Sequence, residues 1–231
     1  MLKIEGLNQY YGQSHTLWDL DLEVPEGQCT VLMGRNGVGK TTLLQCIMGL
    51  LPVKSGSLRY DGGDLTRVAA ERRAALGLGY VPQGRQIFPL LTVEENLQIG
   101  LPARSDGLRK VPDFIYEMFP VLKEMLGRRG GDLSGGQQQQ LAIGRALVTD
   151  PKLLILDEPT EGIQPNIVAE IGNVVRQLNR EMGLTVLLVE QKLPFARKLA
   201  DRFCLIDRGR AVAAGNMPEL GEDLIQQYLT V

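Results

Sequence analysis

The sequence predicts an α/β fold with a mostly parallel sheet, an N-terminal antiparallel β subdomain and an inserted α-helical subdomain. Three observations predict it. Continuous apolar runs alternate with helical patterns, as in a parallel sheet that is covered on both faces. The N-terminal segment instead alternates apolar and polar side chains, which is typical of antiparallel strands with one solvated face. Between about Arg85 and Asp150 strand patterns are scarce and helical patterns dominate.

The antiparallel strands follow from side-chain alternation near the N-terminus. Leu2 and Ile4 share one face of the first expected strand, and the period of two recurs over residues 20–24. Another short strand is expected at Ser57–Tyr60, where the Asp61-Gly62-Gly63 turn closes it. These segments together predict a small sheet beside the main one.

The central strands are expected at the apolar runs 30–33, 153–156 and 185–189. Helices are expected from about Lys40 to Leu50, and from Pro165, a favourable first helical residue, to about Met182. The alternation of these strands and helices predicts the α/β core.

The middle of the chain carries helix signals. Thr92-Val93-Glu94-Glu95 is a capping-box pattern, and Pro112–Leu126 places apolar residues at helical spacing. The predicted organisation is therefore one domain, residues 1–231, with residues 1–84 and 151–231 as the α/β core with its β subdomain and residues 85–150 as the helical subdomain.

Composition excludes several classes of protein. The chain has 231 residues, 44% of them hydrophobic, which is enough to bury a core without disulfides or a structural metal. A net charge of −2 argues against a free nucleic-acid binder. The chain has no run of about 18 apolar residues that could span a bilayer, and its start turns polar too soon for a signal peptide. Cys29, Cys46 and Cys204 are expected to be reduced thiols in a cytosolic protein.

A glycine-rich segment predicts a nucleotide site. Residues 34–41 match the pattern G-x-x-x-x-G-K-[ST] after an apolar strand and before a helix. Backbone N–H groups of such a loop close around phosphate oxygens, and the helix N-terminus adds positive electrostatic potential. Lys40 should reach the β and γ phosphates, and the Thr41 hydroxyl should bind Mg²⁺. The predicted contacts to ATP here are Gly34, Arg35, Asn36, Gly37, Val38, Gly39, Lys40, Thr41 and Thr42. The alternative is a glycine-rich turn before an ordinary helix.

Two acids end a buried strand at Asp157 and Glu158. An Asp in this position can hold Mg²⁺ through water, and Glu158 can polarise the attacking water as a general base. A strand that ends in solvated acids is the alternative. Beside a phosphate-binding loop, the pair favours a hydrolase over a nucleotide-binding module.

The segment Leu133-Ser134-Gly135-Gly136-Gln137 resembles the LSGGQ signature of ABC-type ATPases. Ser134 should cap a helix whose exposed N–H groups and dipole could bind a γ-phosphate presented by another chain. The resemblance covers essentially the whole chain. It implies the ABC ATPase fold and a head-to-tail dimer that holds two ATP molecules between phosphate loop and signature and drives a membrane partner.

The resemblance also assigns residues outside these motifs. Tyr11 matches the aromatic residue that stacks on adenine in this family. Gln83 matches the glutamine that contacts Mg²⁺ and senses the transmembrane partner, and residues 159–165 match the loop that crosses the dimer interface. The implied Mg²⁺ ligands are therefore Thr41, Gln83 and Asp157.

Two positions depart from the family pattern. Gln164 stands where Asp is common, and Gln191 stands where a switch histidine is common. Glutamine can donate an amide N–H to a γ-phosphate but cannot carry a proton. We therefore expect Gln191 to be a phosphate sensor, with Lys40 and Glu158 as the other catalytic residues and Glu158 alone as the base. A weaker hypothesis is slow hydrolysis or a requirement for a different partner subunit.

The Val189-Glu190-Gln191 segment and residues 133–147 resemble the branch that holds the ATPase subunits of branched-chain amino acid and of urea or short-amide importers. Residues 9–22 and 82–89 look closest to the urea-importer subunit, so this resemblance favours urea over branched-chain amino acids as the solute. The resemblance implies a second ABC ATPase subunit, identical or different, transmembrane permease subunits and, indirectly, a periplasmic binding protein, with no nucleic-acid partner. It also implies a peripheral location on the cytoplasmic face of a bacterial inner membrane. The alternatives are a soluble ABC-type ATPase in repair or translation, and a regulatory subunit that binds ATP without hydrolysis.

Other residues receive structural interpretations. The Arg72-Arg73 pair is expected to be solvated, and Gln137–Gln140 to form a polar helix face. The group Phe88-Pro89-Leu90 is either subdomain core or an exposed docking site for a helix of a membrane subunit. His15, the single histidine, is expected at the surface, with a place near the nucleotide as the alternative.

Overall fold

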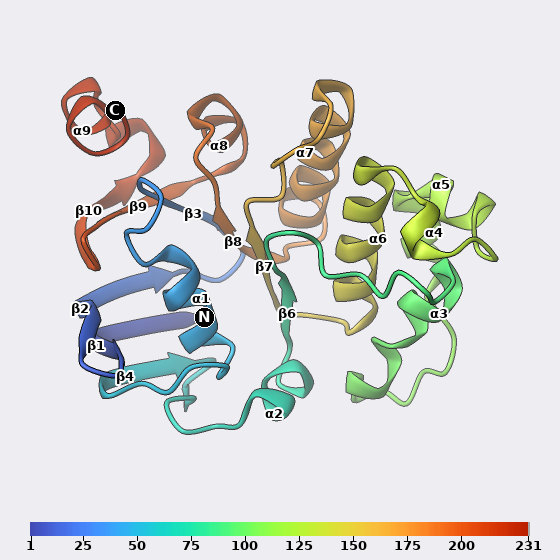
Figure 1. Cartoon of the computed structure of the whole chain (residues 1–231), viewed down its shortest axis with the longest axis horizontal. Coiled ribbons are helices and arrows are strands. Elements are labelled where there is room, and N and C mark those ends of the chain that lie inside the picture. Colours follow the sequence, from blue (N-terminus) through green and yellow to red (C-terminus); the bar gives the residue numbers. More distant parts are fainter. Residues whose placement is uncertain (231) are drawn as a thin grey trace.

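A computed structural model describes residues 1–230 and places them in two sheets with surrounding helices (Figure 1). The larger sheet has the order β10-β9-β3-β8-β7-β6 in the described chain. Its neighbours pair in parallel except β9 and β10, which pair antiparallel. The smaller sheet has the order β2-β1-β4-β5, and all its pairs are antiparallel. The predicted fold class is confirmed.

The strands are β1 (Leu2–Tyr11), β2 (Ser14–Val24), β3 (Cys29–Met33), β4 (Ser55–Tyr60), β5 (Gly63–Asp64), β6 (Leu78–Val81), β7 (Leu153–Asp157), β8 (Thr185–Val189), β9 (Arg202–Asp207) and β10 (Arg210–Asn216). The α-helices are α1 (Lys40–Ile47), α2 (Ala70–Ala75), α3 (Val93–Gln98), α4 (Asp113–Met118), α5 (Pro120–Glu124), α6 (Gly135–Val148), α7 (Pro165–Arg180), α8 (Leu193–Leu199) and α9 (Glu222–Tyr228). Short 3-10 turns lie at Leu101–Ala103, Gly130–Asp132 and Met217–Glu219. Among residues 1–230, every helix is too short or too polar to cross a membrane.

The core is divided by the larger sheet. Strands β3, β7 and β8 are buried along their whole length, and their successive side chains enter two different clusters. Leu154 and Leu156 pack with the helices α3–α7, whereas Leu153 and Ile155 pack with α1 and the smaller sheet. The continuous apolar runs in the sequence arise because both faces of these strands are covered.

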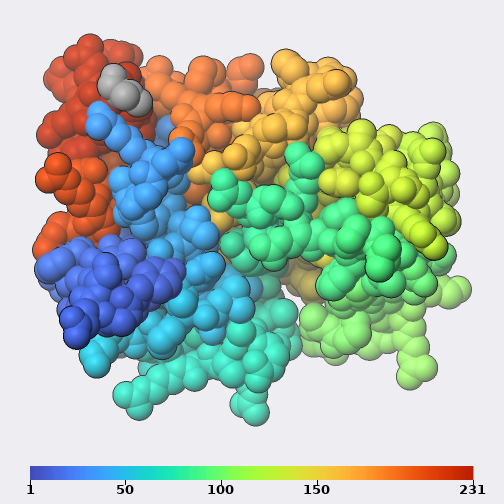
Figure 2. All heavy atoms as spheres, in the orientation of Figure 1, coloured from blue at the N-terminus to red at the C-terminus, as the bar shows by residue number. Residues whose placement is uncertain are grey.

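The chain between β6 and β7 forms the helices α3–α6, which occupy one side of the molecule (Figures 1 and 2). The capping box at the start of α3 is present: Glu95 N donates to Thr92 Oγ1 at 3.1 Å, and Thr92 N donates to Glu95 Oε2 at 2.7 Å. Few strand signals were expected here, and the helical content agrees. The exact division after residue 84 and before residue 151 remains a prediction.

Three predicted helices end differently from the expectation. The expected helix over 112–126 is two helices, because Pro120 cannot continue the backbone ladder and Phe119 before it leaves helical geometry. Helix α1 ends at Ile47 rather than Leu50, just before Gly49 adopts a positive φ of 73°. Helix α7 starts at Pro165 as predicted and ends at Arg180, two residues before the expected Met182.

Two polar segments are more buried than predicted. Arg73 is 2% exposed, whereas its neighbour Arg72 is exposed. The Arg73 guanidinium donates to backbone carbonyls of α1 and of the segment before α2, so the prediction of a solvated pair is wrong for Arg73. The expectation of a polar face over Gln137–Gln140 is likewise wrong at Gln139 and Gln140, which are buried because α6 is packed on several sides.

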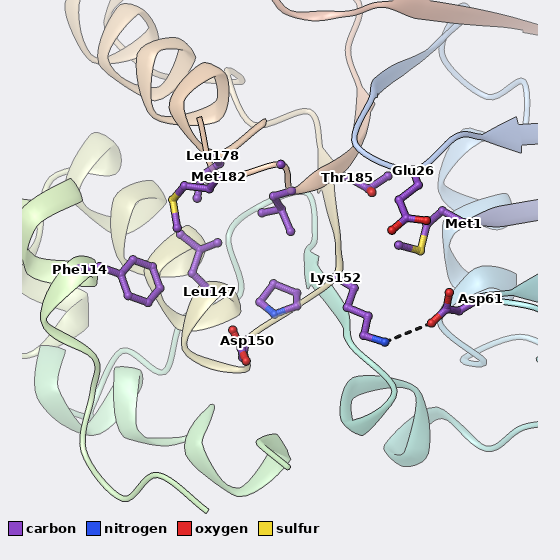
Figure 3. A pocket seen from close by; sticks show the side chains of 13 residues that line it. Met1, Glu26, Asp61, Phe114, Leu147, Asp150, Lys152, Leu178, Met182 and Thr185 are labelled. Atoms are coloured by element: carbon purple, nitrogen blue, oxygen red, sulfur yellow. Dashed lines mark hydrogen bonds and ion pairs between the residues drawn. The ribbon is translucent and has the colours of Figure 1, made fainter. Parts of the chain in front are cut away.

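A cavity of about 400 Å³ lies at the amino ends of β7 and β8 (Figure 3). Phe114, Leu147 and Met182 line one part of it, and Lys152 points toward Asp61, with which it forms an ion pair of 3.1 Å. None of the residues predicted for nucleotide binding lines this cavity.

Candidate nucleotide site

The predicted site residues gather at the carboxyl ends of the parallel strands. The loop of residues 34–39 joins β3 to α1, Asp157 ends β7, and Gln83 and Gln191 each follow the end of a neighbouring strand by two residues. These ends meet at one edge of a parallel sheet, where ligands of open α/β folds bind. A cavity of about 670 Å³ lies there, and Asn36, Lys40, Glu158 and Gln191 are among its lining residues.

The glycines of the loop are required by its backbone. Gly34 and Gly39 have φ values of 155° and 108°. A Cβ on Gly34 would lie 2.3 Å from the Ile206 carbonyl oxygen, and one on Gly39 would lie 2.8 Å from Leu17 Cδ2. Larger residues at these positions would therefore disturb the loop. Val38 is buried, and the Arg35 guanidinium turns away to donate to the Thr230 carbonyl.

Lys40 lies inside the curve of this loop. Its side chain is buried, and its ammonium donates to the carbonyl oxygens of Gly34 at 2.8 Å and Arg35 at 2.9 Å. The same nitrogen is 3.8 Å from Glu158 Oε1. Burial lowers the pKa of Lys40, and the charges of Glu158 and Asp157 oppose that shift. The phosphate-loop lysine and the acidic strand end thus face each other, as the motifs predict.

Asp157 and Glu158 occupy different environments. Asp157 is 2% exposed, and burial, together with the charge of Glu158, raises the pKa of Asp157 to about 6. Its Oδ2 atom has no hydrogen-bond partner within residues 1–230. Glu158 has a positive φ of 47°, and its backbone N–H donates to the Val189 carbonyl at 2.9 Å. A non-glycine residue with this φ carries backbone strain, so the surrounding contacts must hold it.

Gln191 joins two predicted motifs directly. Its Nε2 donates to Asn36 Oδ1 at 2.7 Å and to Glu158 Oε1 at 2.6 Å. The side chain therefore spans the phosphate loop and the acidic strand end. The amide N–H groups that the sequence led us to expect on a γ-phosphate are thus bonded to Asn36 and Glu158.

Five further residues of this cavity, Thr16 among them, were not predicted from the sequence to line it. Glu190 is a buried acid directly before Gln191, and Thr160, Glu161 and Lys192 also line the cavity. Gln83 Nε2 donates to Glu161 Oε2 at 3.0 Å. A signal for Glu190 was present in the sequence, because a charged residue directly after a run of buried apolar residues needs a partner.

Of the remaining predicted contacts, two line the cavity, and Tyr11 is not part of its lining. Thr41 and Thr42 line it. Tyr11 is half exposed, and its hydroxyl lies 3.5 Å from Thr42 Oγ1 and 3.3 Å from Gln45 Oε1. His15 stacks between Tyr10 and Trp18, with ring centroids 4.0 Å and 3.5 Å apart, and its Nε2 lies 2.9 Å from Asn8 Oδ1. The single histidine thus belongs to an aromatic stack on β1 and β2, outside the cavity lining.

The signature segment starts α6 and lies outside this cavity. Ser134 is its N-cap: Gln137 N donates to Ser134 Oγ at 3.3 Å, and Ser134 N donates to Gln137 Oε1 at 2.9 Å. A Cβ on Gly135 would lie 3.0 Å from the Arg85 guanidinium, and one on Gly136 would lie 2.8 Å from Ile167. The two glycines therefore permit close contacts on this turn, and within one chain the signature does not reach Lys40's cavity.

These features define a P-loop nucleotide-binding protein: the glycine-rich loop, its lysine, the acidic strand end and the N-terminus of α1. Residues 17–161 match the ABC transporter family. The branched-chain amino acid transport ATP-binding protein BraG of Pseudomonas aeruginosa is 44% identical over 92% of this chain and 91% of its own length. The corresponding protein LivF of Archaeoglobus fulgidus, described as probable, is 37% identical over 96% and 94%.

Solved structures agree with this likeness. A nucleotide-free ATP-binding cassette from an ABC transporter has a TM-score of 0.84 and 28% identity, covering 99% of this chain and 94% of that one. A dimeric cassette in a post-hydrolysis state, bound to ADP and Pi, has a TM-score of 0.83 and 25% identity, covering 94% and 99%. The chain belongs to the ABC transporter family. It is an ATP-binding subunit of a transporter and hydrolyses ATP.

Proposed function

We propose that the chain powers a bacterial importer from the cytoplasmic face of the inner membrane, as one half of an ATPase dimer. The observation that carries the proposal is the position of Gln191, whose amide is within 2.7 Å of Asn36 and 2.6 Å of Glu158. With Lys40 only 3.8 Å from the same Glu158 oxygen, three motifs that are distant in sequence converge on one point. That point suits the γ-phosphate of ATP.

Each residue has a distinct role in this proposal. Backbone N–H groups of residues 34–39 and the Lys40 ammonium hold the phosphates. Thr42 and Tyr11 extend the site toward the adenine of ATP. Glu158 accepts a proton from the attacking water. Gln191 donates its amide N–H to the γ-phosphate and orients Glu158. The stabilisation of the transferring phosphoryl group is electrostatic, as in other P-loop enzymes.

The donor set also suits Mg²⁺. Thr41, Gln83 and Asp157 offer hydroxyl, amide and carboxylate oxygens, which are the ligands that this ion prefers. The buried Asp157 Oδ2, which lacks a partner within residues 1–230, would accept a water of the ion. When bound, Mg²⁺ neutralises charge on the phosphate oxygens.

The signature segment Ser134–Gln137 would act on a second subunit's nucleotide. It starts a helix with two glycines and lies away from this chain's own cavity, which supports a contact with ATP from across a subunit interface. The proposed partners are a second ABC ATPase subunit, permease subunits, and through them a periplasmic binding protein. Phe88 and Leu90 are 46% and 78% exposed, which supports the docking interpretation of this group over the core alternative.

We propose branched-chain amino acids as the transported solute class, because the relatives BraG and LivF carry that description. Urea or a short amide is the second candidate, supported by the resemblance of residues 9–22 and 82–89 to the urea-importer branch. Uptake of radiolabelled leucine and urea into cells that lack this gene separates the two, since only the transported solute should be lost.

The ATPase proposal is tested with Glu158→Gln, which removes the base but keeps the side-chain size. Hydrolysis should fall at least about 100-fold, while light scattering should show a dimer only with Mg-ATP. Glu181→Gln, at an exposed acid outside the cavity, is the matched control and should hydrolyse ATP like the wild type. Steady-state turnover that survives in Glu158→Gln would remove the assignment of Glu158. Salt-sensitive binding of DNA or ribosomes would favour the soluble alternative.

A further inference from the structure

The carboxylate of Glu190 is buried beside the proposed catalytic residues. It directly follows β8, is 3% exposed, and has no role in nucleotide binding or hydrolysis assigned to it above. Its backbone N–H donates to the Leu32 carbonyl at 3.3 Å, on the strand that leads into the phosphate loop. A buried acid at this point requires partners, because an unpaired buried carboxylate is costly.

Both oxygens of this carboxylate have well-defined partners. Oε1 accepts the backbone N–H groups of Gln191 at 2.8 Å and Lys192 at 3.0 Å. Oε2 accepts the hydroxyl of Thr160 at 2.7 Å. Thr160 is itself 1% exposed and lies in the loop that follows Glu158. One side chain therefore connects the backbone that carries Gln191 to the loop that carries Glu158.

A second bond joins the same two segments. Lys192 Nζ donates to the Thr160 carbonyl at 3.0 Å. The Glu190 carboxylate also accepts the backbone N–H groups of Gln191 and Lys192. Together these bonds fix the direction in which residue 191 leaves the sheet. The Gln191 amide can then reach Asn36 and Glu158 together. Hydrogen bonds to an ionised acceptor are shorter and stronger than neutral ones, so this connection is stiff.

We propose that Glu190 is a positioning residue for hydrolysis, and that it acts through Thr160 and the backbone of Gln191. Movement of the loop after Glu158 would be transmitted through the Thr160 hydroxyl to the Gln191 amide. The proposal rests on the role of Gln191 proposed above. Glu190 itself contacts neither water nor phosphate in this scheme.

The test removes only the Thr160 hydroxyl. In Thr160→Val, kcat should fall by about tenfold or more, with KM for ATP within about twofold of wild type, because one buried charge-assisted hydrogen bond is lost while the phosphate loop is intact. Thr160→Ser restores a hydroxyl and should recover most of kcat. Thr185→Val is the matched control, since Thr185 is equally buried and its hydroxyl accepts the Gly27 N–H at 2.9 Å, away from the site.

The control separates positioning from stability. Urea unfolding should show a loss of stability in both valine variants, but kcat should stay within about twofold of wild type only in Thr185→Val. A Thr160→Val enzyme with wild-type kcat, or one that Thr160→Ser cannot rescue, would overturn the proposal.

The path through Gln191 is tested in a Gln191→Ala background. There, Thr160→Val should lower kcat by less than about twofold further, because the group that it positions is already missing. A full additional tenfold loss would overturn the proposed path. Unchanged kcat in Gln191→Ala alone would instead remove the role of Gln191, whereas a slow Gln191→Ala with a fully active Thr160→Val would remove only the role of Glu190.

Discussion

The buried guanidinium of Arg73 should be one of the most stabilising polar groups of the chain. Its Nη1 donates to the Cys46 carbonyl at 2.8 Å and to the Ile47 carbonyl at 2.6 Å, at the end of α1. Its Nη2 and Nε donate to the carbonyls of Leu65 at 2.7 Å and Val68 at 2.9 Å. The side chain thus anchors the C-terminus of the helix that begins at Lys40.

The magnitude follows from which carbonyls have another donor. Cys46 O also accepts the Gly49 N–H, and Leu65 O also accepts the Val68 N–H. The carbonyls of Ile47 and Val68 depend more on Arg73. A buried group left without its partner costs about 1–3 kcal/mol, so Arg73→Met should lower the free energy of unfolding by roughly 2–6 kcal/mol. Loss of a cation at a helix C-terminus acts in the same direction.

Reversible urea denaturation followed by circular dichroism measures this difference. Arg72→Met is the matched control, because Arg72 is exposed one residue earlier on the same helix, and it should change the free energy of unfolding by less than about 0.5 kcal/mol. If Arg73→Met were no less stable than Arg72→Met, the four carbonyl bonds would contribute nothing net and the reasoning would fail.

The phosphate loop, the buried Asn96 and the three cysteines can each be tested in the same way. Lys40→Ala should weaken ATP binding at least about tenfold in calorimetry, because a buried ammonium that would face the phosphates is lost; unchanged affinity would contradict the phosphate role. Asn96→Ala should destabilise the chain by about 2–4 kcal/mol, since the buried amide makes four backbone bonds around residues 88–92; exposed Gln98→Ala is the control, and equal urea midpoints would refute it. A thiol reagent at pH 8 should label the native chain slowly and should label all three cysteines of the unfolded chain. The reason is that burial raises the pKa of Cys46 to about 11 and that of Cys29 and Cys204 to about 12. Rapid labelling of the native chain would count against that burial.

Much of the fold was predictable because its signals are local. The apolar runs at β3, β7 and β8 predict covered strands, since each successive side chain is buried. The capping boxes at Thr92 and Ser134 predict helix starts, because capping depends on residues only three apart. Pro120 was an equally local signal for a break after Phe119, and helical spacing alone hid it.

The contacts that were missed are long-range. Arg73 is buried because the end of α1 approaches it from 26 residues away at Ile47. The bond between Thr160 and Glu190 joins residues 30 apart, on segments after different strands. No periodicity encodes such a pairing, so the sequence could indicate that Glu190 needs a partner but not which residue supplies it.

Strand order explains why the loop after β7 becomes the centre of the site. β7 lies between β6 and β8, so the segment that follows it can contact the segments after both neighbours. Glu158 and Thr160 bond to the segment after β8, while Glu161 accepts from Gln83 after β6. Arg85 extends the chain of contacts, since its Nη1 donates to Gln138 of α6 at 3.3 Å. The sheet order therefore joins the phosphate loop to the signature helix through one loop, although the sequence presents them as separate motifs.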